Sequence, residues 1–227
     1  MESQGAVDLA CGDGYLLELL ATRLPSAKLI GVDMSAEELQ LARERLRGKN
    51  VEFVNARVEA LPLDDASVEA ALCHMALMLF DDAPAVVAEL ARVIRPGGTF
   101  AAMLGPAPGN SELFKRFGGL LHEAVTAESL PPLEAGDRAT FEEDSLRALF
   151  GGDVWIDVRL ENVRVLFDGP DERVQTTLLS MYDVARLSSE GQAELARRLA
   201  AEIKERRAVG APVECVLGMR HLVARRA

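Results

Sequence analysis

The chain has 227 residues, which is enough for one α/β domain with a well-buried core. Hydrophobic residues make up 49% of it, charged residues 27% and aromatic residues only 5%, a composition typical of globular proteins. The formal net charge of −11 argues against nucleic acid as a partner, because affinity for nucleic acid rests mainly on Lys and Arg side chains that neutralise phosphates.

Short β-like runs alternate with amphipathic helices over the first hundred residues. We expect helices at 15–24, after Ser35 and around Pro84, and strands at residues 5–10, 28–32, 51–55, 68–73 and 99–104. Ser35 and Glu38 form an S-x-x-E capping box, and the RPGG run at 95–98 is a strong helix breaker. This alternation predicts an α/β fold, with a parallel sheet covered by helices on both faces.

The pattern changes after Gly105. Helices are expected at 111–125 and from Thr140, which forms a capping box with Glu143, and a Gly/Pro-rich loop (LPPLEAGD) joins them. The last predicted elements are helices at 171–186 and 189–207 and strands at 154–167 and 213–223. Because no stretch resembles an interdomain linker, we expect a single domain over 1–227. Residues 106–150 are expected to form an insertion over the active edge of the sheet, a helical lid that selects the substrate.

The three cysteines, at positions 11, 73 and 215, are widely separated and indicate neither a metal site nor a disulfide framework. No apolar run reaches the ~20 residues that a membrane span needs. The first ten residues lack the basic and apolar regions of a signal peptide. We therefore expect a cytoplasmic protein without a metal and without a membrane partner.

The first predicted strand leads into the sequence DLACGDG at residues 8–14, and a helix follows at once. Glycines in such a turn let a ligand approach the backbone without a Cβ in the way. Asp33 ends the second strand, where a carboxylate can accept hydrogen bonds from ribose hydroxyls. Together, these features predict a cofactor that contains adenosine.

The chain resembles the class I S-adenosylmethionine-dependent methyltransferases, in a branch of small bacterial enzymes of type 11 or 25. The resemblance covers residues 7–104. It rests on Asp8, Gly12 and Gly14 with Cys11 between them, and on GVDMS at 31–35, EALP at 59–62 and RVIRPGG at 92–98. Dinucleotide-binding loops usually carry a third glycine where this chain has Leu17, which argues against NAD or FAD.

The resemblance implies a Rossmann-like, doubly wound, three-layer α/β/α fold with a seven-stranded, mostly parallel sheet whose last strand is antiparallel. It also implies S-adenosylmethionine as cofactor, S-adenosylhomocysteine as product and a small-molecule acceptor. Because methyl transfer is an in-line displacement at an already activated carbon, the protein acts mainly through proximity and orientation. The resemblance does not decide whether the protein is a monomer or a homodimer.

The resemblance further implies a role for each residue of the expected cofactor site. Asp8 and the backbone of 10–14, which includes Ala10, Cys11, Gly12 and Gly14, would hold the amino-acid end of the cofactor. Asp33 would hold the ribose, Met34 would pack on the adenine, and Cys73 would face the methionine part. The adenine edge would be bordered by Arg57, Val58 and Glu59.

Two positions depart from the family pattern. Ala10 stands at the first glycine position, where we expect its methyl group to be tolerated. Arg57 stands where the family usually has an Asp that accepts from the adenine amino group, and arginine has only donors. Arg57 could instead stack on the ring or point away, and adenine recognition would then rest on backbone groups.

The family has no universal catalytic residue. His74, at the end of the fourth strand, is the best candidate for a general base, and His122 on the helix at 111–125 is a second. The family usually has an N-terminal helical segment over the cofactor, whereas this chain begins almost at the first strand. The pocket would then be closed by a segment missing from this chain, by residues 106–150 or by a partner chain.

Three alternatives stay open. The chain could bind S-adenosylmethionine without transferring a methyl group, or it could be another nucleotide-dependent enzyme such as an NAD oxidoreductase. A protein or nucleic-acid methyltransferase is the third. Against methylation of a base amino group, the end of the fourth strand reads CHMA at 73–76 instead of an Asn/Asp-Pro-Pro-Tyr-type motif.

Overall fold

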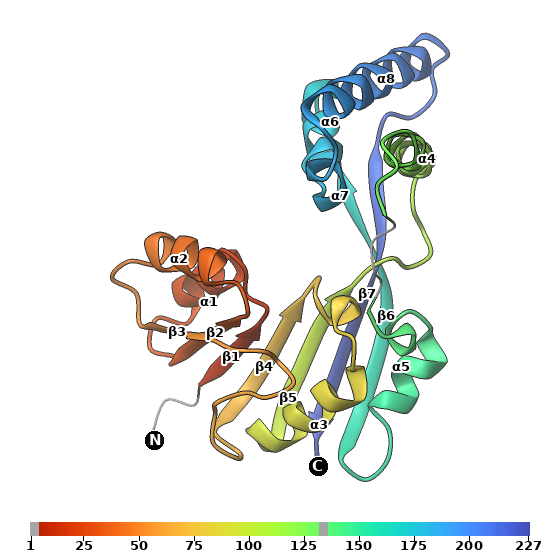
Figure 1. Ribbon diagram of the computed structural model, residues 1–227. Coiled ribbons are helices and arrows are strands. Elements are labelled where there is room, and N and C mark those ends of the chain that lie inside the picture. Colours follow the sequence, from red (N-terminus) through yellow and green to blue (C-terminus); the bar gives the residue numbers. More distant parts are fainter. Residues whose placement is uncertain (1–4, 132–135) are drawn as a thin grey trace. The chain divides into compact units, whose positions relative to one another are not determined.

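The computed structural model describes residues 5–131 and 136–227. Its strands form one seven-stranded sheet in the order β3-β2-β1-β4-β5-β7-β6 (Figure 1). The strands span β1 Ala6–Leu9, β2 Leu29–Asp33, β3 Val51–Asn55, β4 Val68–His74, β5 Ile94–Leu104, β6 Trp155–Phe167 and β7 Cys215–Arg226. The first five pair in parallel, whereas β7 runs antiparallel to β5. The predicted Rossmann-like sheet with an antiparallel last strand is confirmed.

The chain divides into two compact units, and the expected single domain over 1–227 stays a prediction. Unit 1 comprises Met1–Gly105, Ala135–Glu161 and Arg220–Ala227, and unit 2 comprises Pro106–Glu134 and Asn162–Met219. The boundaries fall inside β6 and β7. They also divide the segment 106–150 that was expected to be a lid, because its first part belongs to unit 2 and its last part to unit 1. A lid function for this segment stays a prediction.

Unit 1 contains α1 (Tyr15–Arg23), α2 (Ala36–Arg45), α3 (Ala83–Val93) and α5 (Glu143–Leu149) (Figure 1). Alternation along β2 assigns these helices to the two faces of the sheet. Leu29 belongs to a core cluster with residues of α1 and α2, whereas Ile30 and Val32 belong to a larger cluster with residues of α3 and α5. The helices of unit 1 therefore form a layer on each face of the sheet.

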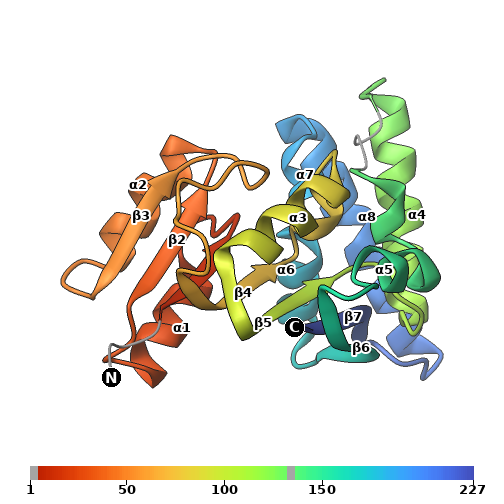
Figure 2. The ribbon, with the colours of Figure 1, turned by 90° about the horizontal axis from the view of Figure 1, so that it is seen from below.

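Unit 2 contains α4 (Glu112–Ala127), α6 (Asp171–Leu179), α7 (Tyr182–Ala185) and α8 (Ser189–Ala208). Both α4 and α6 pack against α8 (Figure 2). The core of this unit is built from apolar side chains of the helices and the nearby strand residues, such as Phe117, Leu178, Leu199 and Cys215. Unit 2 thus has a hydrophobic core of its own.

The predicted capping box at Thr140 is wrong. Asp137 caps a short 3-10 turn, η2 (Arg138–Thr140), by accepting from the Ala139 N–H, and the Thr140 hydroxyl donates back to the Asp137 carbonyl at 2.7 Å. The helix starts only at Glu143. The helix expected over 171–186 is also interrupted, because α6 ends at Leu179 and α7 begins at Tyr182.

The RPGG breaker ends α3 at Val93, as expected, but it lies inside β5 instead of before it. Gly98 explains why these residues can pair as a strand. A Cβ at this position would lie 2.6 Å from the carbonyl oxygen of Glu69 in β4, so only glycine allows the two backbones to come this close.

Candidate active site

The loop of residues 10–14 links β1 to α1 and bends through three left-handed residues. Ala10, Gly12 and Gly14 have φ values of 51°, 52° and 80°. For Ala10 this conformation costs about 1 kcal/mol, a strain that is more common at functional sites than elsewhere. The first glycine position therefore accommodates a methyl group, although at a cost in backbone energy.

The two glycines of this loop have different roles. A Cβ on Gly12 would meet nothing closer than a Glu38 carboxylate oxygen at 3.8 Å, so its surroundings are open. A Cβ on Gly14 would lie 3.0 Å from Leu46 and 3.1 Å from Ala42. Gly12 can therefore admit a ligand close to the backbone, whereas Gly14 lets the start of α1 pack against the end of α2.

Asp33, at the end of β2, holds the loop in place. Its two carboxylate oxygens accept from the Gly12 and Ser35 N–H groups, each at 2.8 Å. A carboxylate offers about four acceptor sites, so capacity remains for ribose hydroxyls. Asn55 donates to the carbonyls of Asp33 and Met34 at 2.9 Å, which fixes the turn that carries Met34. The predicted ribose residue thus also shapes the loop that faces the ligand.

A cavity of ≈ 290 Å³, named here the Asp8 cavity, opens beside this loop. Its lining comprises Asp8, Ala10, Cys11, Gly12, Asp13, Tyr15, Leu16, Leu19 and His74. Burial, with a smaller contribution from the Asp33 carboxylate, raises the pKa of Asp8 to about 7. A ligand cation beside Asp8 would favour its ionised form, so this cavity suits a positively charged group.

His74 and the cysteines differ in what they can do chemically. Partial burial lowers the pKa of His74 below its ordinary value, so its ring is neutral at pH 7 and can accept a proton. Burial raises the pKa of both Cys11 and Cys73 to about 12, so these thiols stay protonated and are poor nucleophiles. His74 is therefore better suited than either thiol to accept a proton.

A second cavity, named here the Glu59 cavity, has a volume of ≈ 190 Å³ and shares Ala10 with the first. Its apolar lining comprises Ala10, Met34, Ala56, Val58, Leu79 and Phe80, and its ionisable lining comprises Arg57, Glu59 and Asp81. The Met34 side chain is 69% exposed, as expected for an apolar surface that a ligand would cover. The Arg57 guanidinium lies 2.9 Å from a Glu59 carboxylate oxygen.

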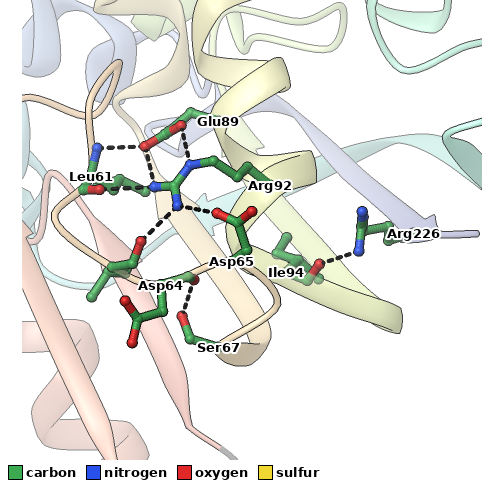
Figure 3. Close-up of polar contacts among 9 residues, drawn as sticks. Leu61, Asp64, Asp65, Ser67, Glu89, Arg92, Ile94 and Arg226 are labelled. Atoms are coloured by element: carbon green, nitrogen blue, oxygen red, sulfur yellow. Dashed lines mark hydrogen bonds and ion pairs between the residues drawn. The ribbon is translucent and has the colours of Figure 1, made fainter.

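A clamp formed by Arg92 and Glu89 fixes the segment that follows Glu59 (Figure 3). The Arg92 guanidinium donates to the carbonyls of Leu61 and Leu63 at 2.9 and 2.7 Å, and to Asp65 at 2.7 Å. It also donates twice to Glu89, at 2.6 and 2.8 Å. Glu89 in turn accepts from the Leu61 N–H at 2.7 Å. These contacts join the EALP motif to Arg92, the first residue of the RVIRPGG motif.

Most predicted site residues lie together in unit 1. Gly14, Asp33 and Cys73 are not among the residues that line either cavity, and His122 is exposed on α4 of unit 2. The predicted role of every site residue stays a prediction. The sequence reasoning missed two groups of lining residues, namely Leu79, Phe80 and Asp81, and Tyr15, Leu16 and Leu19. Tyr15 and Leu19 could have been recognised as lining residues, because they are large apolar residues at the start of α1 that remain exposed.

The donor set of the two cavities fits S-adenosylmethionine. The Asp8 and Glu59 carboxylates line the cavities, and the Asp33 carboxylate, which lines neither cavity, holds the Gly12 N–H beside them. Ionised carboxylates only accept hydrogen bonds, and this ligand presents an ammonium, a sulfonium, ribose hydroxyls and an amino group. The same carboxylates would repel the pyrophosphate of a dinucleotide. In the described ranges, 5–131 and 136–227, no cluster of His, Cys, Asp and Glu could hold a metal ion, and no helix is long and apolar enough to span a bilayer.

The strand order and the loop at 10–14 define a Rossmann-like fold, a class in which ligands bind at the carboxyl ends of the strands. Residues 7–102 match a family described as methyltransferase domain. This part of the chain, less than half of its residues, is thus similar to the methyltransferase domains of type 11, which are class I S-adenosylmethionine-dependent enzymes.

Similar proteins agree with this assignment. A demethylmenaquinone methyltransferase of Thermus thermophilus is 35% identical over 104 residues, which is 45% of this chain and 47% of the relative. The chain thus spans less than half the length of that relative. A phosphoethanolamine N-methyltransferase of Haemonchus contortus, solved with S-adenosylhomocysteine, aligns with 99% of this chain and 49% of its own, at a TM-score of 0.59 and 16% identity. A geranyl diphosphate C-methyltransferase of Streptomyces coelicolor aligns with 100% of this chain and 73% of its own, at a TM-score of 0.56 and 15% identity.

Proposed function

We propose that this protein transfers a methyl group from S-adenosylmethionine to a small-molecule acceptor. The observation that carries the proposal is the pair of cavities that meet at Ala10, one beside the buried Asp8 carboxylate and the other lined mainly by apolar side chains. The methionine end of the cofactor fits the first cavity and the adenine end fits the second. The relatives named above methylate quinone precursors, phosphorylated amines and prenyl diphosphates, so their names support a small molecule without defining which one.

When bound, the cofactor supplies a methyl group that its sulfonium already activates. The chain's own residues hold the ligand and manage protons. Asp8 stabilises positive charge, Asp33 holds the ribose while it anchors Gly12, and Met34 covers the purine. His74, neutral at pH 7, takes the proton of an oxygen or nitrogen acceptor. Alignment of the acceptor supplies most of the rate enhancement, up to about 7–11 kcal/mol for a well-oriented pair.

Isothermal titration with S-adenosylmethionine, S-adenosylhomocysteine and NAD tests the cofactor. We expect both sulfur ligands to bind and NAD not to bind. If neither sulfur ligand binds at concentrations well above micromolar, the proposal is refuted.

Release of S-adenosylhomocysteine against a panel of metabolites tests the transfer step. With an acceptor identified, His74→Gln should lower kcat by about 10²–10⁴-fold wherever the acceptor proton is not acidic. Cofactor binding without product release from any metabolite of the panel would favour a binding protein without transferase activity.

A further inference from the structure

We propose that Glu59, held in place by Arg57, accepts the hydrogen bond from the exocyclic amino group of the bound purine. The cavity then selects a 6-aminopurine over a 6-oxopurine. This inference rests on the proposed function, because it concerns the purine end of the same ligand.

The chemistry of the Glu59 cavity leaves this task to few side chains. Six of its nine lining residues are apolar and can cover the faces of a flat ring, but they cannot read its edge. Recognition of the edge by side chains therefore falls to Arg57, Glu59 and Asp81. Since an amino group donates hydrogen bonds and arginine only donates, the acceptor has to be one of the two carboxylates.

Burial and contacts favour Glu59 over Asp81. The Glu59 side chain is only 19% exposed, and the Arg57 guanidinium holds it at 2.9 Å. Asp81 is exposed in the loop before α3. An acceptor that is already oriented loses little side-chain entropy when the ligand arrives, whereas an exposed carboxylate has to be ordered first.

The backbone around Glu59 is fixed on both sides. A turn in which the Ala60 N–H donates to the Arg57 carbonyl at 3.3 Å brings the two charged side chains together. Leu61, two residues further on, is held by the Arg92–Glu89 clamp through both its N–H and its carbonyl. In the described part of the chain, the Arg57 contact is the one hydrogen bond assigned to the Glu59 carboxylate. It thus has acceptor sites left for a ligand.

A 6-oxopurine would turn a carbonyl oxygen toward this carboxylate. The purine oxygen and the Glu59 carboxylate would then face each other as two acceptors in a partly buried place, without a hydrogen bond between them, which costs binding free energy. Arg57 is a positioning residue in this arrangement, because it acts through the Glu59 carboxylate.

The test compares the affinities of S-adenosylhomocysteine and S-inosylhomocysteine by isothermal titration. The wild-type protein should bind the 6-amino ligand at least about tenfold more tightly. Glu59→Gln has nearly the same shape, but its amide can both donate and accept, so the preference should fall to about threefold or less. Asp81→Asn is the matched control and should keep the wild-type preference.

Arg57 provides a second readout. Arg57→Ala should reduce the preference, while Arg57→Lys, which keeps a cation within reach of Glu59, should retain most of it. An unchanged preference in Glu59→Gln, or its loss in Asp81→Asn, overturns the inference. Equal binding of both ligands by the wild-type protein also overturns it and leaves the proposed function standing, whereas no binding of either ligand overturns both.

Discussion

Arg92 connects the EALP motif, which follows β3, to the RVIRPGG motif at the junction of α3 and β5, and its removal is the sharpest perturbation that the structure suggests. All five N–H groups of its guanidinium are used, by two backbone carbonyls, one oxygen of Asp65 and both oxygens of Glu89. Arg92→Ala removes these contacts together. Arg147 on α5 is a matched control in the same unit, because its ion pair with Glu143 is a simple i,i+4 contact at 2.9 Å.

The expected cost follows from burial. The Glu89 side chain is only 13% exposed and would lose its counter-ion, while the carbonyls of Leu61 and Leu63 would lose their donor. Breaking a fully buried pair costs about 3–5 kcal/mol, but the Arg92 side chain is 33% exposed and water would replace part of the loss. We therefore expect Arg92→Ala to lower the free energy of unfolding by about 2–4 kcal/mol. For Arg147→Ala, with both partners more than 40% exposed, we expect less than about 0.5 kcal/mol.

Urea unfolding gives the stability change, and amide hydrogen exchange locates it. Exchange should accelerate first at residues 57–65, the segment that Arg92 holds, and the affinity for S-adenosylhomocysteine should fall because this segment carries the Arg57–Glu59 pair. A destabilisation no larger than that of Arg147→Ala, or unchanged exchange at 57–65, would refute the reasoning.

The other predictions concern the site and one strand contact. Asp33→Ala should weaken binding of S-adenosylhomocysteine at least about tenfold, measured by titration, because it removes both the ribose acceptor and the anchor of the Gly12 N–H; an unchanged affinity would exclude Asp33 from the site. The pKa of Asp8, raised to about 7 from its ordinary 3.8, means that its folded form binds a proton more tightly than the unfolded chain. Its contribution to stability is therefore present below pH 4 and is lost as the pH rises through 7, up to about 4 kcal/mol. Urea midpoints between pH 4 and 8 should fall more steeply for the wild type than for Asp8→Asn, and parallel curves would contradict this. Gly98→Ala should destabilise unit 1 by about 1–3 kcal/mol in the same assay, because the new Cβ would lie 2.6 Å from the Glu69 carbonyl; a neutral effect would show that the strands can separate without cost.

The elements of the sheet could be predicted from sequence because their signals are local. Period-2 and period-3.6 patterns placed the strands and most helices. Ser35 caps α2 by accepting from the Glu38 N–H as expected, but the Ser35 N–H donates to Asp33, so only half of the predicted capping box forms. The predicted helix cap at Thr140 is wrong because the Thr140 hydroxyl donates instead to the Asp137 carbonyl. Nothing in the sequence indicated the two units, because their boundaries fall inside strands β6 and β7 and no linker marks these positions.

The site was predictable only in part, for a related reason. The loop at 10–14 and Asp33 are contiguous motifs with a physical meaning, and the structure joins them through the Gly12 N–H. Arg92 and Leu61 are about thirty residues apart in the sequence, so neither motif by itself predicted their contact. The same holds for Phe80, whose place in the Glu59 cavity depends on how the chain returns after β4.

The position of β7 has a consequence for the order in which the protein can fold on the ribosome. Residues 220–225 pair with β5, and Leu222 and Ala224 fill the core that α3 and α5 cover. These residues are translated more than a hundred positions after the β5 strand that they complete. During synthesis, β5 therefore emerges with an unpaired edge, and this edge is protected from other strands only after residues 220–225 have been translated.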